Sequence, residues 1–172
     1  MEEKKIWTLG HSTRALEEFV VILQSFQIET LIDVRSLPGS RKFPHYDKEA
    51  LEVSMSKYNI QYFHFKDLGG RRKTSKVSKN VAWRLASFRG YADYMETDEF
   101  KEAVEKLEDI GRTTRTAYMC AEAVWWSCHR SLISDYLKFR GWSVFDIMDI
   151  GKAQEHPYTS PARIVDHQLV YY

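Results

Sequence analysis

The chain has 172 residues, of which 44% are apolar and 28% are charged, and its formal net charge is +1. This balance is typical of a globular protein and excludes an intrinsically disordered chain, which would carry fewer apolar residues. A chain of this length is expected to form a single domain that buries about 70% of the surface its unfolded form exposes.

Five short stretches predict strands because they are apolar and rich in β-branched or aromatic residues. In chain order they are residues 6–9, 30–34, 60–65, 116–120 and 143–147. Their nearly continuous apolar character is typical of strands covered on both faces, as in a parallel sheet.

The segments between these strands carry apolar residues at helical spacing. The first helix follows Thr13, and the clearest one begins at Thr97 or Asp98 and ends at Gly111. The remaining helices are expected at residues 47–58, 81–88, 91–95 and 127–140. Strands that alternate with helices in this way predict an α/β fold.

We therefore predict a three-layer α/β fold, with a mostly parallel five-stranded sheet and helices on both faces. Right-handed crossovers favour the strand order 3-2-1-4-5. In this order the chain reverses between the first and fourth strands, so the loops after Leu9 and Cys120 should face each other. Residues 1–172 are expected to form one domain, with a basic loop inserted near 71–80 and an irregular tail near 152–172.

Polar residues gather in the loops that follow the predicted strands, at the edge of the sheet where ligands bind in open α/β folds. We predict a ligand site there, with His11, Arg35, Glu122 and Arg130 lining one pocket. The candidate residues of these loops are His11, Ser12, Arg14, Arg35, Ser40, Arg41, Gly69, Gly70, Arg71, Glu122, Cys128, His129 and Arg130.

Cys128 is expected near a helix N-terminus, next to His129 and Arg130. The helix dipole and nearby positive charge lower the pKa of a thiol from about 8.5 toward neutrality, which would make Cys128 a nucleophile. Cys120, at the end of a strand, is the other candidate nucleophile and a candidate binding residue. The alternative is that both thiols are inert packing residues, as buried cysteines often are.

His11 and Glu122 are candidates for a general base and a general acid, provided that the loops meet as predicted. Asp33 lies at the end of a strand, close to Arg35. This pair is expected to form an ion pair, and Asp33 is not expected to act as a catalyst.

A strand, a loop and a helix that carry Cys and Arg have the layout of cysteine phosphatases and rhodaneses. The phosphatase arginine lies six residues beyond its cysteine, whereas that position after Cys120 is Trp126. The bulky residues 123–126 also do not suit an anion cradle of backbone amides, so we reject both assignments. A metal site that combines the cysteines with His11 or His129 is not predicted either, because adjacent Cys128 and His129 would diverge by about 100° on a helix.

Residues 68–92 contain no acidic residue, and Trp83 and Tyr91 interleave with their basic side chains. Such clusters bind phosphates, and aromatic side chains can stack on bases. The alternative is an ordinary solvated surface. Because like charges repel, residues 71–79 are expected to be exposed and mobile when no ligand is bound. The basic residues of the segment are Arg71, Arg72, Lys73, Lys76, Lys79, Arg84 and Arg89.

The expected location is the cytoplasm. The two cysteines are too few for a secreted disulfide scaffold. No apolar run approaches the ~20 residues that a membrane span needs, and the first residues lack the pattern of a signal peptide. We therefore expect no contact with a membrane.

Short motifs spread along the chain form a recognisable set. They are Gly10-His11-Ser12, Asp33-Val34-Arg35 with Pro38 and Ser40-Arg41, Leu68-Gly69-Gly70, Tyr91-Ala92-Asp93-Tyr94-Met95, Met119-Cys120-Ala121-Glu122, 128–133 and 157–163. In this order they resemble the family of the domain of unknown function 488, DUF488, over nearly the whole chain. The resemblance implies a three-layer α/β fold and a ligand site that includes Tyr94 among the candidate binding residues, but it implies no reaction.

Two functions are expected from these residues. The first is an enzyme that acts on a phosphate-containing or nucleobase-containing substrate. Its catalytic candidates are His11, Glu122 and Cys128, and its candidates for holding the anion are Arg35, Arg41 and Arg130. The second is a non-catalytic nucleotide or nucleic-acid sensor that uses the same pocket and the basic loop. The sequence identifies no reaction, no cofactor and no oligomeric state.

Overall fold

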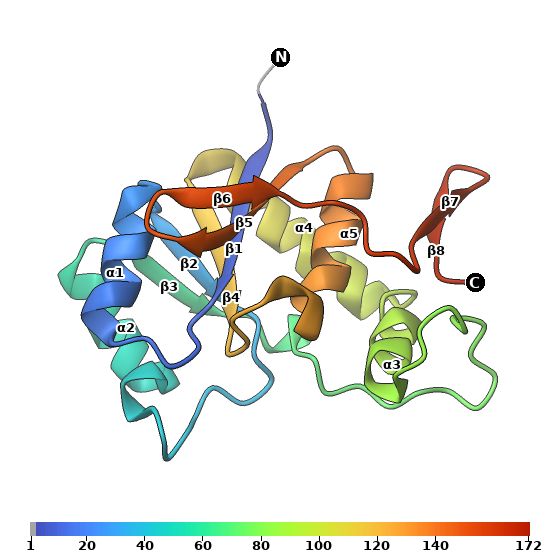
Figure 1. Cartoon of the computed structure of the whole chain (residues 1–172), viewed down its shortest axis with the longest axis horizontal. Helices are drawn as coiled ribbons and strands as arrows, with labels where there is room; N and C mark the ends of the chain where they lie inside the picture. Colours follow the sequence, from blue (N-terminus) through green and yellow to red (C-terminus); the bar gives the residue numbers. More distant parts are fainter. Residues whose placement is uncertain (1–2) are drawn as a thin grey trace.

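A six-stranded sheet forms the centre of the structure, a computed structural model that describes residues 3–172 (Figure 1). The strands are β1 (Lys5–Gly10), β2 (Thr30–Asp33), β3 (Gln61–His64), β4 (Thr116–Cys120), β5 (Ser143–Asp149) and β6 (Lys152–Glu155). Their order is β3-β2-β4-β1-β5-β6. All neighbouring pairs are parallel except β5 and β6. The predicted α/β fold with a mostly parallel sheet is confirmed.

The predicted order 3-2-1-4-5 is wrong because β4 lies between β1 and β2. Ala117 of β4 pairs with Trp7 on one side and with Leu31 on the other. All residues of β4 are buried, as expected for a strand with neighbours on both sides. The prediction assumed that β1 and β2, which are consecutive in the chain, are also neighbours in the sheet. Consecutive strands are often neighbours, but not always. The sixth strand was missed because its four residues are all exposed and carry no apolar signal.

Helices cover both faces of the sheet, as predicted. They are α1 (Leu16–Ser25), α2 (Lys48–Lys57), α3 (Ala86–Tyr94), α4 (Asp98–Thr113) and α5 (Arg130–Phe139). Leu23 of α1 and Met55 of α2 belong to the core on one face, and Leu107 of α4 and Leu137 of α5 belong to the core on the other (Figure 1). No helix within residues 3–172 has both the length and the apolar character that a membrane crossing requires.

Several predicted helix boundaries differ from the structure. The helix expected to end at Gly111 continues through it to Thr113, as α4. The two short helices expected at 81–88 and 91–95 are one helix, α3, which runs through Gly90, and residues 81–85 are not helical. The helix expected at 127–140 begins later, at Arg130, because residues Trp125–Ser127 form a short 3-10 turn, η3. Cys128 therefore precedes α5 and has an extended backbone, with φ −138° and ψ 151°.

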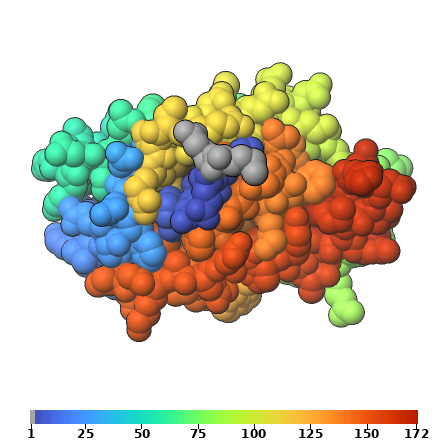
Figure 2. Space-filling view, turned by 90° about the horizontal axis from the view of Figure 1, so that it is seen from above, coloured from blue at the N-terminus to red at the C-terminus, as the bar shows by residue number. Residues whose placement is uncertain are grey.

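The tail near 152–172, expected to be irregular, contains β6 and a hairpin of β7 (Arg163–Val165) and β8 (Gln168–Val170). Asp166 and His167 connect the hairpin strands, and both have positive φ, as a two-residue type I′ turn requires. Beyond the hairpin, the Tyr171 hydroxyl donates to Asp135 of α5 at 2.9 Å. The space-filling view shows the red C-terminal residues against the orange segment that carries α5 (Figure 2).

The carboxyl ends of β1 and β4 lie side by side, and the helices that follow them leave toward opposite faces. The loops after the two strands meet as predicted, because His11 N donates to Cys120 O at 2.9 Å. The approach requires Gly10, since a Cβ atom there would lie 1.5 Å from Glu122 O. Ligands of open α/β sheets bind at such a point, so this edge is where the site is sought.

Candidate functional site

Two pockets open at the carboxyl edge of the sheet, and Glu122 lines both. The histidine pocket is lined by His11, Ser12, Thr13, Arg35, Leu37, Gly39, Ser40, Phe43, Ala121, Glu122 and Ala123. The cysteine pocket is lined by Gly70, Leu85, Ser87, Phe88, Glu122, Trp126, Ser127, Cys128 and His129. The structure therefore brings many of the predicted residues to one edge, but it divides them between two pockets.

Arg35 is engaged by Asp33, with which it forms the expected ion pair. Its Nε donates to Asp33 Oδ1 at 2.9 Å and its Nη2 donates to Oδ2 at 2.7 Å. Nη2 also donates to Tyr46 O, and the Tyr62 hydroxyl donates to the same carboxylate. Most of the positive charge of Arg35 is thus compensated within the fold, which leaves it little charge for an anionic ligand.

His11 is buried and holds Arg35 from the other side. Its Nδ1 donates to Ser12 O at 2.8 Å, which leaves Nε2 as an acceptor 3.4 Å from Arg35 Nη1. The imidazole stacks on the Tyr46 ring at a centroid distance of 4.1 Å. Burial, together with the nearby charge of Arg35, lowers the pKa of His11 to about 4. His11 is therefore a neutral imidazole at physiological pH.

The two cysteines form a buried thiol pair, with their sulfur atoms 2.7 Å apart. Cys120 ends β4 and is 2% exposed, whereas Cys128 is 6% exposed and lines the cysteine pocket. Burial and the hydrogen bond with Cys128 raise the pKa of Cys120. Burial alone would also raise the pKa of Cys128, but the hydrogen bond with Cys120 and the charge of Arg130 lower it. The surroundings thus favour the thiolate form of Cys128 and disfavour that of Cys120.

Arg130 does not line either pocket, in contrast to the prediction, because its side chain lies behind the thiol pair. It is 1% exposed. Its Nε donates to Cys120 Sγ at 2.9 Å, its Nη1 to Thr8 Oγ1 at 3.1 Å and its Nη2 to Glu122 O at 2.9 Å. Among the ion pairs within residues 3–172, none includes Arg130. The atom in direct contact with the guanidinium that can supply a counter-charge is Cys120 Sγ, and Cys128 Sγ lies next to it.

His129 supplies a nitrogen that faces the thiol pair. Its Nε2 donates to Val34 O at 2.9 Å, so Nδ1 is the unprotonated nitrogen, 3.4 Å from Cys128 Sγ. Burial lowers the pKa of His129. Gly70 makes room for this ring, since a Cβ atom at Gly70 would lie 2.6 Å from His129 Nδ1. The Leu68-Gly69-Gly70 motif is therefore explained in part by the position of an imidazole.

The basic loop is more firmly held than expected. Arg71, Lys73, Lys76 and Lys79 are exposed, as predicted. Arg72 is not, because its guanidinium stacks 3.5 Å over the Tyr94 ring and donates to Gly69 O. Asp93 anchors the same loop by accepting hydrogen bonds from Ser75 N, Ser78 Oγ and Asn80 Nδ2.

The other predicted residues lie outside the thiol pair, and among them Ser12 and Ser40 line the histidine pocket. Arg14 donates to Gly10 O and Met148 O, and Arg41 is exposed. Ser40 Oγ accepts from the backbone of its own loop, at Lys42 and Phe43. Within residues 3–172, no group of three or more His, Cys, Asp and Glu side chains is arranged to hold a metal ion.

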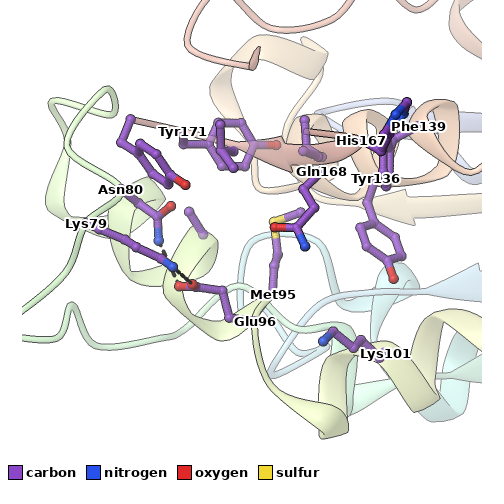
Figure 3. A pocket seen from close by; sticks show the side chains of 14 residues that line it. Lys79, Asn80, Met95, Glu96, Lys101, Tyr136, Phe139, His167, Gln168 and Tyr171 are labelled. Atoms are coloured by element: carbon purple, nitrogen blue, oxygen red, sulfur yellow. Dashed lines mark hydrogen bonds and ion pairs between the residues drawn. The ribbon is translucent and has the colours of Figure 1, made fainter. Parts of the chain in front are cut away.

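A different pocket lies away from this edge, among α3, α4, α5 and the β7–β8 hairpin (Figure 3). Lys79 and Glu96 form an ion pair of 3.3 Å at one side of it, and Gln168 and Tyr136 are among its other lining residues. None of the residues predicted for the site lines this pocket.

Sequence reasoning missed two features of the thiol site. It assigned the role of base to His11, whereas the imidazole that faces Cys128 belongs to His129. The two side chains were expected to diverge on a helix, but the extended backbone of Cys128 removes that constraint. Thr8, which holds Arg130, was also missed. A hydroxyl within an otherwise apolar strand was the signal that could have found it.

The fold and the site define an α/β protein with a thiol pair beside a buried guanidinium, at the carboxyl edge of its sheet. The family model described as "Domain of unknown function DUF488" matches residues 15–137. The chain therefore belongs to the DUF488 family, as its motifs indicated. No curated protein and no solved structure matched the chain. The matched range includes both cysteines, His129 and Arg130, so the thiol site lies within the part of the chain that the family shares.

Proposed function

We propose that the protein is an enzyme that uses Cys128 as a nucleophile toward a phosphate-containing or nucleobase-containing substrate at the carboxyl edge. The surroundings of the Cys128 sulfur carry this proposal. The sulfur lies 2.7 Å from Cys120 Sγ, 3.4 Å from His129 Nδ1 and 3.5 Å from the Arg130 backbone N–H. Cys128 also lines a pocket that a substrate can enter.

His129 and Arg130 have distinct roles in this proposal. His129 Nδ1 accepts the proton of the Cys128 thiol, because its other nitrogen is already committed to Val34 O. The guanidinium of Arg130 and the N-terminus of α5 then stabilise the thiolate. A thiolate in turn compensates a buried guanidinium, whose desolvation costs several kcal/mol when it is left uncompensated.

The walls of the cysteine pocket support a substrate with a flat apolar group. Leu85, Phe88 and Trp126 line it, and Leu85 and Trp126 are more than half exposed, at 61% and 55%. Arg71 and Arg84 are exposed and adjacent in sequence to the lining residues Gly70 and Leu85. A nucleobase with an attached phosphate combines the apolar ring and the negative charge that these residues favour.

Glu122 completes the proposed machinery as the general acid. It is exposed, and it lines both pockets, so its carboxyl group is available to a substrate that reaches from one to the other. In this scheme the Cys128 sulfur forms a bond to the substrate as the bond to the leaving group breaks, and the carboxyl group of Glu122 gives the leaving group a proton. Water then cleaves the covalent intermediate and restores the thiol. His11 contributes by keeping Arg35 in place.

The test begins with ligands that the purified protein retains, identified by native mass spectrometry, followed by turnover assays on a panel of nucleotides. We expect at least one nucleotide to be converted, and Cys128→Ser to lower kcat by about 1,000-fold or more. Glu122→Gln should lower kcat with little change in affinity. Lys106→Ala, at an exposed position of α4, serves as the matched surface control. Unchanged turnover in Cys128→Ser, or no conversion of any nucleotide, would refute the proposal.

The exposed basic loop favours a second candidate, a non-catalytic sensor of nucleotides or nucleic acid. Arg71, Lys73 and Lys76 project from it without an acidic partner among the described ion pairs of residues 3–172. Replacing all three by alanine should reduce the salt dependence of binding to labelled single-stranded DNA by up to about three phosphate contacts. Arg72 is left unchanged because it anchors the loop on Tyr94.

Fluorescence anisotropy between low and moderate salt measures this slope. The matched control replaces Lys48, Lys57 and Lys106, which are equally exposed but lie on α2 and α4. If the control variant loses as much binding as the loop variant, the interaction is non-specific. In that case a small-molecule substrate remains as the partner.

A further inference from the structure

We infer that the Cys120–Cys128 pair is a peroxide-reactive dithiol, in which Cys128 attacks a hydroperoxide and Cys120 resolves the product as an intramolecular disulfide. This inference extends the proposed function, because it uses the same Cys128 thiolate and states how the site is regulated. It rests on the positions of the two sulfurs, their unequal access to solvent and the charge beside them.

The separation of the sulfurs is the first observation. At 2.7 Å they are closer than two unbonded sulfurs usually lie, and they need to approach by well under 1 Å to reach the disulfide bond length of about 2.05 Å. Both cysteines are free thiols in this structure. Cys128 lies in an extended segment before α5, outside the sheet that fixes Cys120. Closing the bond is therefore a movement of one side chain.

Access to solvent sets the order of the reaction. Cys128 lines the cysteine pocket, whereas Cys120 lies behind it at the end of β4. A small oxidant from the pocket reaches Cys128 first. Arg130 and the α5 N-terminus favour the thiolate there, and thiolates are the form of cysteine that attacks peroxides.

The reaction balances in two steps. The Cys128 thiolate attacks one oxygen of hydrogen peroxide, the O–O bond breaks, and the products are Cys128 sulfenic acid and a hydroxide that takes up a proton to become water. The Cys120 thiol then attacks the sulfenic sulfur, its proton leaves with the hydroxyl group as water, and the disulfide forms. Overall, two thiols are oxidised by two electrons and the peroxide is reduced to water. A dithiol reductant reverses the oxidation.

Oxidation also changes the charge around Arg130. Among residues 3–172, the guanidinium contacts one group that can become an anion, Cys120, and its other hydrogen bonds go to Thr8 Oγ1 and Glu122 O. A disulfide carries no charge, so oxidation removes this counter-charge. A disulfide that leaves a buried cation uncompensated is less stable than its thiolate form and is therefore readily reduced. The pair is suited to reversible inactivation of the nucleophile, which protects Cys128 from irreversible oxidation.

The test treats the full-length protein with hydrogen peroxide and follows it by intact mass and peptide mapping. We expect the loss of two hydrogens, a Cys120–Cys128 cross-linked peptide, complete loss of iodoacetamide labelling at Cys128, and recovery with dithiothreitol. The protein unfolded in urea is the control for unassisted oxidation and should react at least about tenfold more slowly. Equal rates, an intermolecular disulfide, or direct oxidation of Cys128 to sulfinic acid would overturn the inference.

The Cys120→Ala variant separates the two steps. After peroxide treatment it should carry a sulfenic acid at Cys128, detected with dimedone, and should then proceed to sulfinic acid because no resolving thiol is present. The wild-type result stands even if this variant does not fold. Disulfide formation in a protein that converts no nucleotide would overturn the proposed function alone. Full turnover with both thiols free after peroxide treatment would overturn the redox inference alone.

Discussion

Arg130 is the residue on which the chemistry of the thiol pair depends most directly. Its guanidinium is buried, and it touches Cys120 while its backbone N–H points to Cys128. Replacing it by methionine, which has a similar length and no charge, should raise the pKa of Cys128 and slow its alkylation at neutral pH by on the order of tenfold. Rates of iodoacetamide labelling from pH 5 to 10 measure this shift.

The Arg130→Lys variant provides the comparison, because it retains the positive charge but cannot make all three hydrogen bonds of the guanidinium, to Cys120, Thr8 and Glu122. Its pH profile should lie between those of the wild type and Arg130→Met. A profile of Arg130→Met that coincides with the wild type would show that the guanidinium does not set the reactivity of Cys128.

At the scale of elements, the loop after β3 positions the imidazole of His129 beside the thiol pair. A Cβ atom at Gly70 would lie 2.6 Å from His129 Nδ1, so Gly70→Ala must displace the imidazole or the loop. We expect the alanine to cost about 1–3 kcal/mol of stability and to slow alkylation of Cys128. Urea unfolding and labelling kinetics measure the two effects.

Gly39→Ala is the matched control for this change. A Cβ atom there meets only Asp47 Oδ1, at 3.9 Å, so it fits without displacement. We expect neither its stability nor its labelling rate to change by more than a few tenths of a kcal/mol or about twofold. If the two alanine variants behave alike, the position of His129 does not depend on Gly70.

The elements themselves were largely predictable from the sequence. The apolar stretches at 6–9 and 116–120 correspond to β1 and β4, because strands covered on both faces need nearly continuous apolar residues. The polar strand β6 could not be found in this way, since its residues face solvent. It is held by antiparallel pairing with β5, to which residues 150–151 connect it, and this pairing leaves no apolar pattern in its sequence.

The candidate site was predictable in location but not in its contacts. The predicted reversal of the chain between the first and fourth strands placed the loops after β1 and β4 together, and the structure confirms that they meet. The rule does not state which side chains turn inward. Arg130 is the first residue of α5, and its side chain points toward the sheet, where it donates to Thr8 Oγ1, and not into the pocket. Such a choice depends on packing across three elements.

At the scale of the whole molecule, a buried ionic cluster joins the C-terminal segment to α5 and β5. His156 lies 3.0 Å from both Asp135 Oδ1 and Asp146 Oδ2, and Thr159 and Tyr171 donate to the same Asp135 carboxylate. Burial alone would lower the pKa of His156, but its hydrogen bonds to the two carboxylates raise it. The two carboxylates therefore favour the imidazolium form of His156 over the neutral form.

This shift makes the stability of the fold depend on pH in a definite direction. The pKa of His156 is higher in the folded state than its unfolded value of about 6.5. The stabilisation that protonated His156 contributes is therefore fully present below pH 6.5 and is lost as the pH rises through the pKa of the folded state. Urea unfolding of the wild type from pH 5 to 9 should show this decline. His156→Gln should be less stable by about 3 kcal/mol at pH 5 and show a flatter profile.

The His167→Asn variant is the control, because His167 is exposed and asparagine tolerates its positive φ of 63°. It should keep the wild-type profile. A decline of equal size in His156→Gln and the wild type would assign the pH dependence to another group.

The central place of β4 has a consequence for the synthesis of the chain. When the ribosome has produced β1, β2 and β3, the position between β1 and β2 is still empty, and residues 116–120 are needed to fill it. A nascent chain that ends before β4 therefore holds the β2–β3 pair and a β1 segment without either of its partners, β4 and β5. Chaperones are the usual protection for chains with such open strand edges. The cysteine pair forms later still, since it needs both the end of β4 and the start of α5. The two thiols thus meet only after most of the chain has been synthesised.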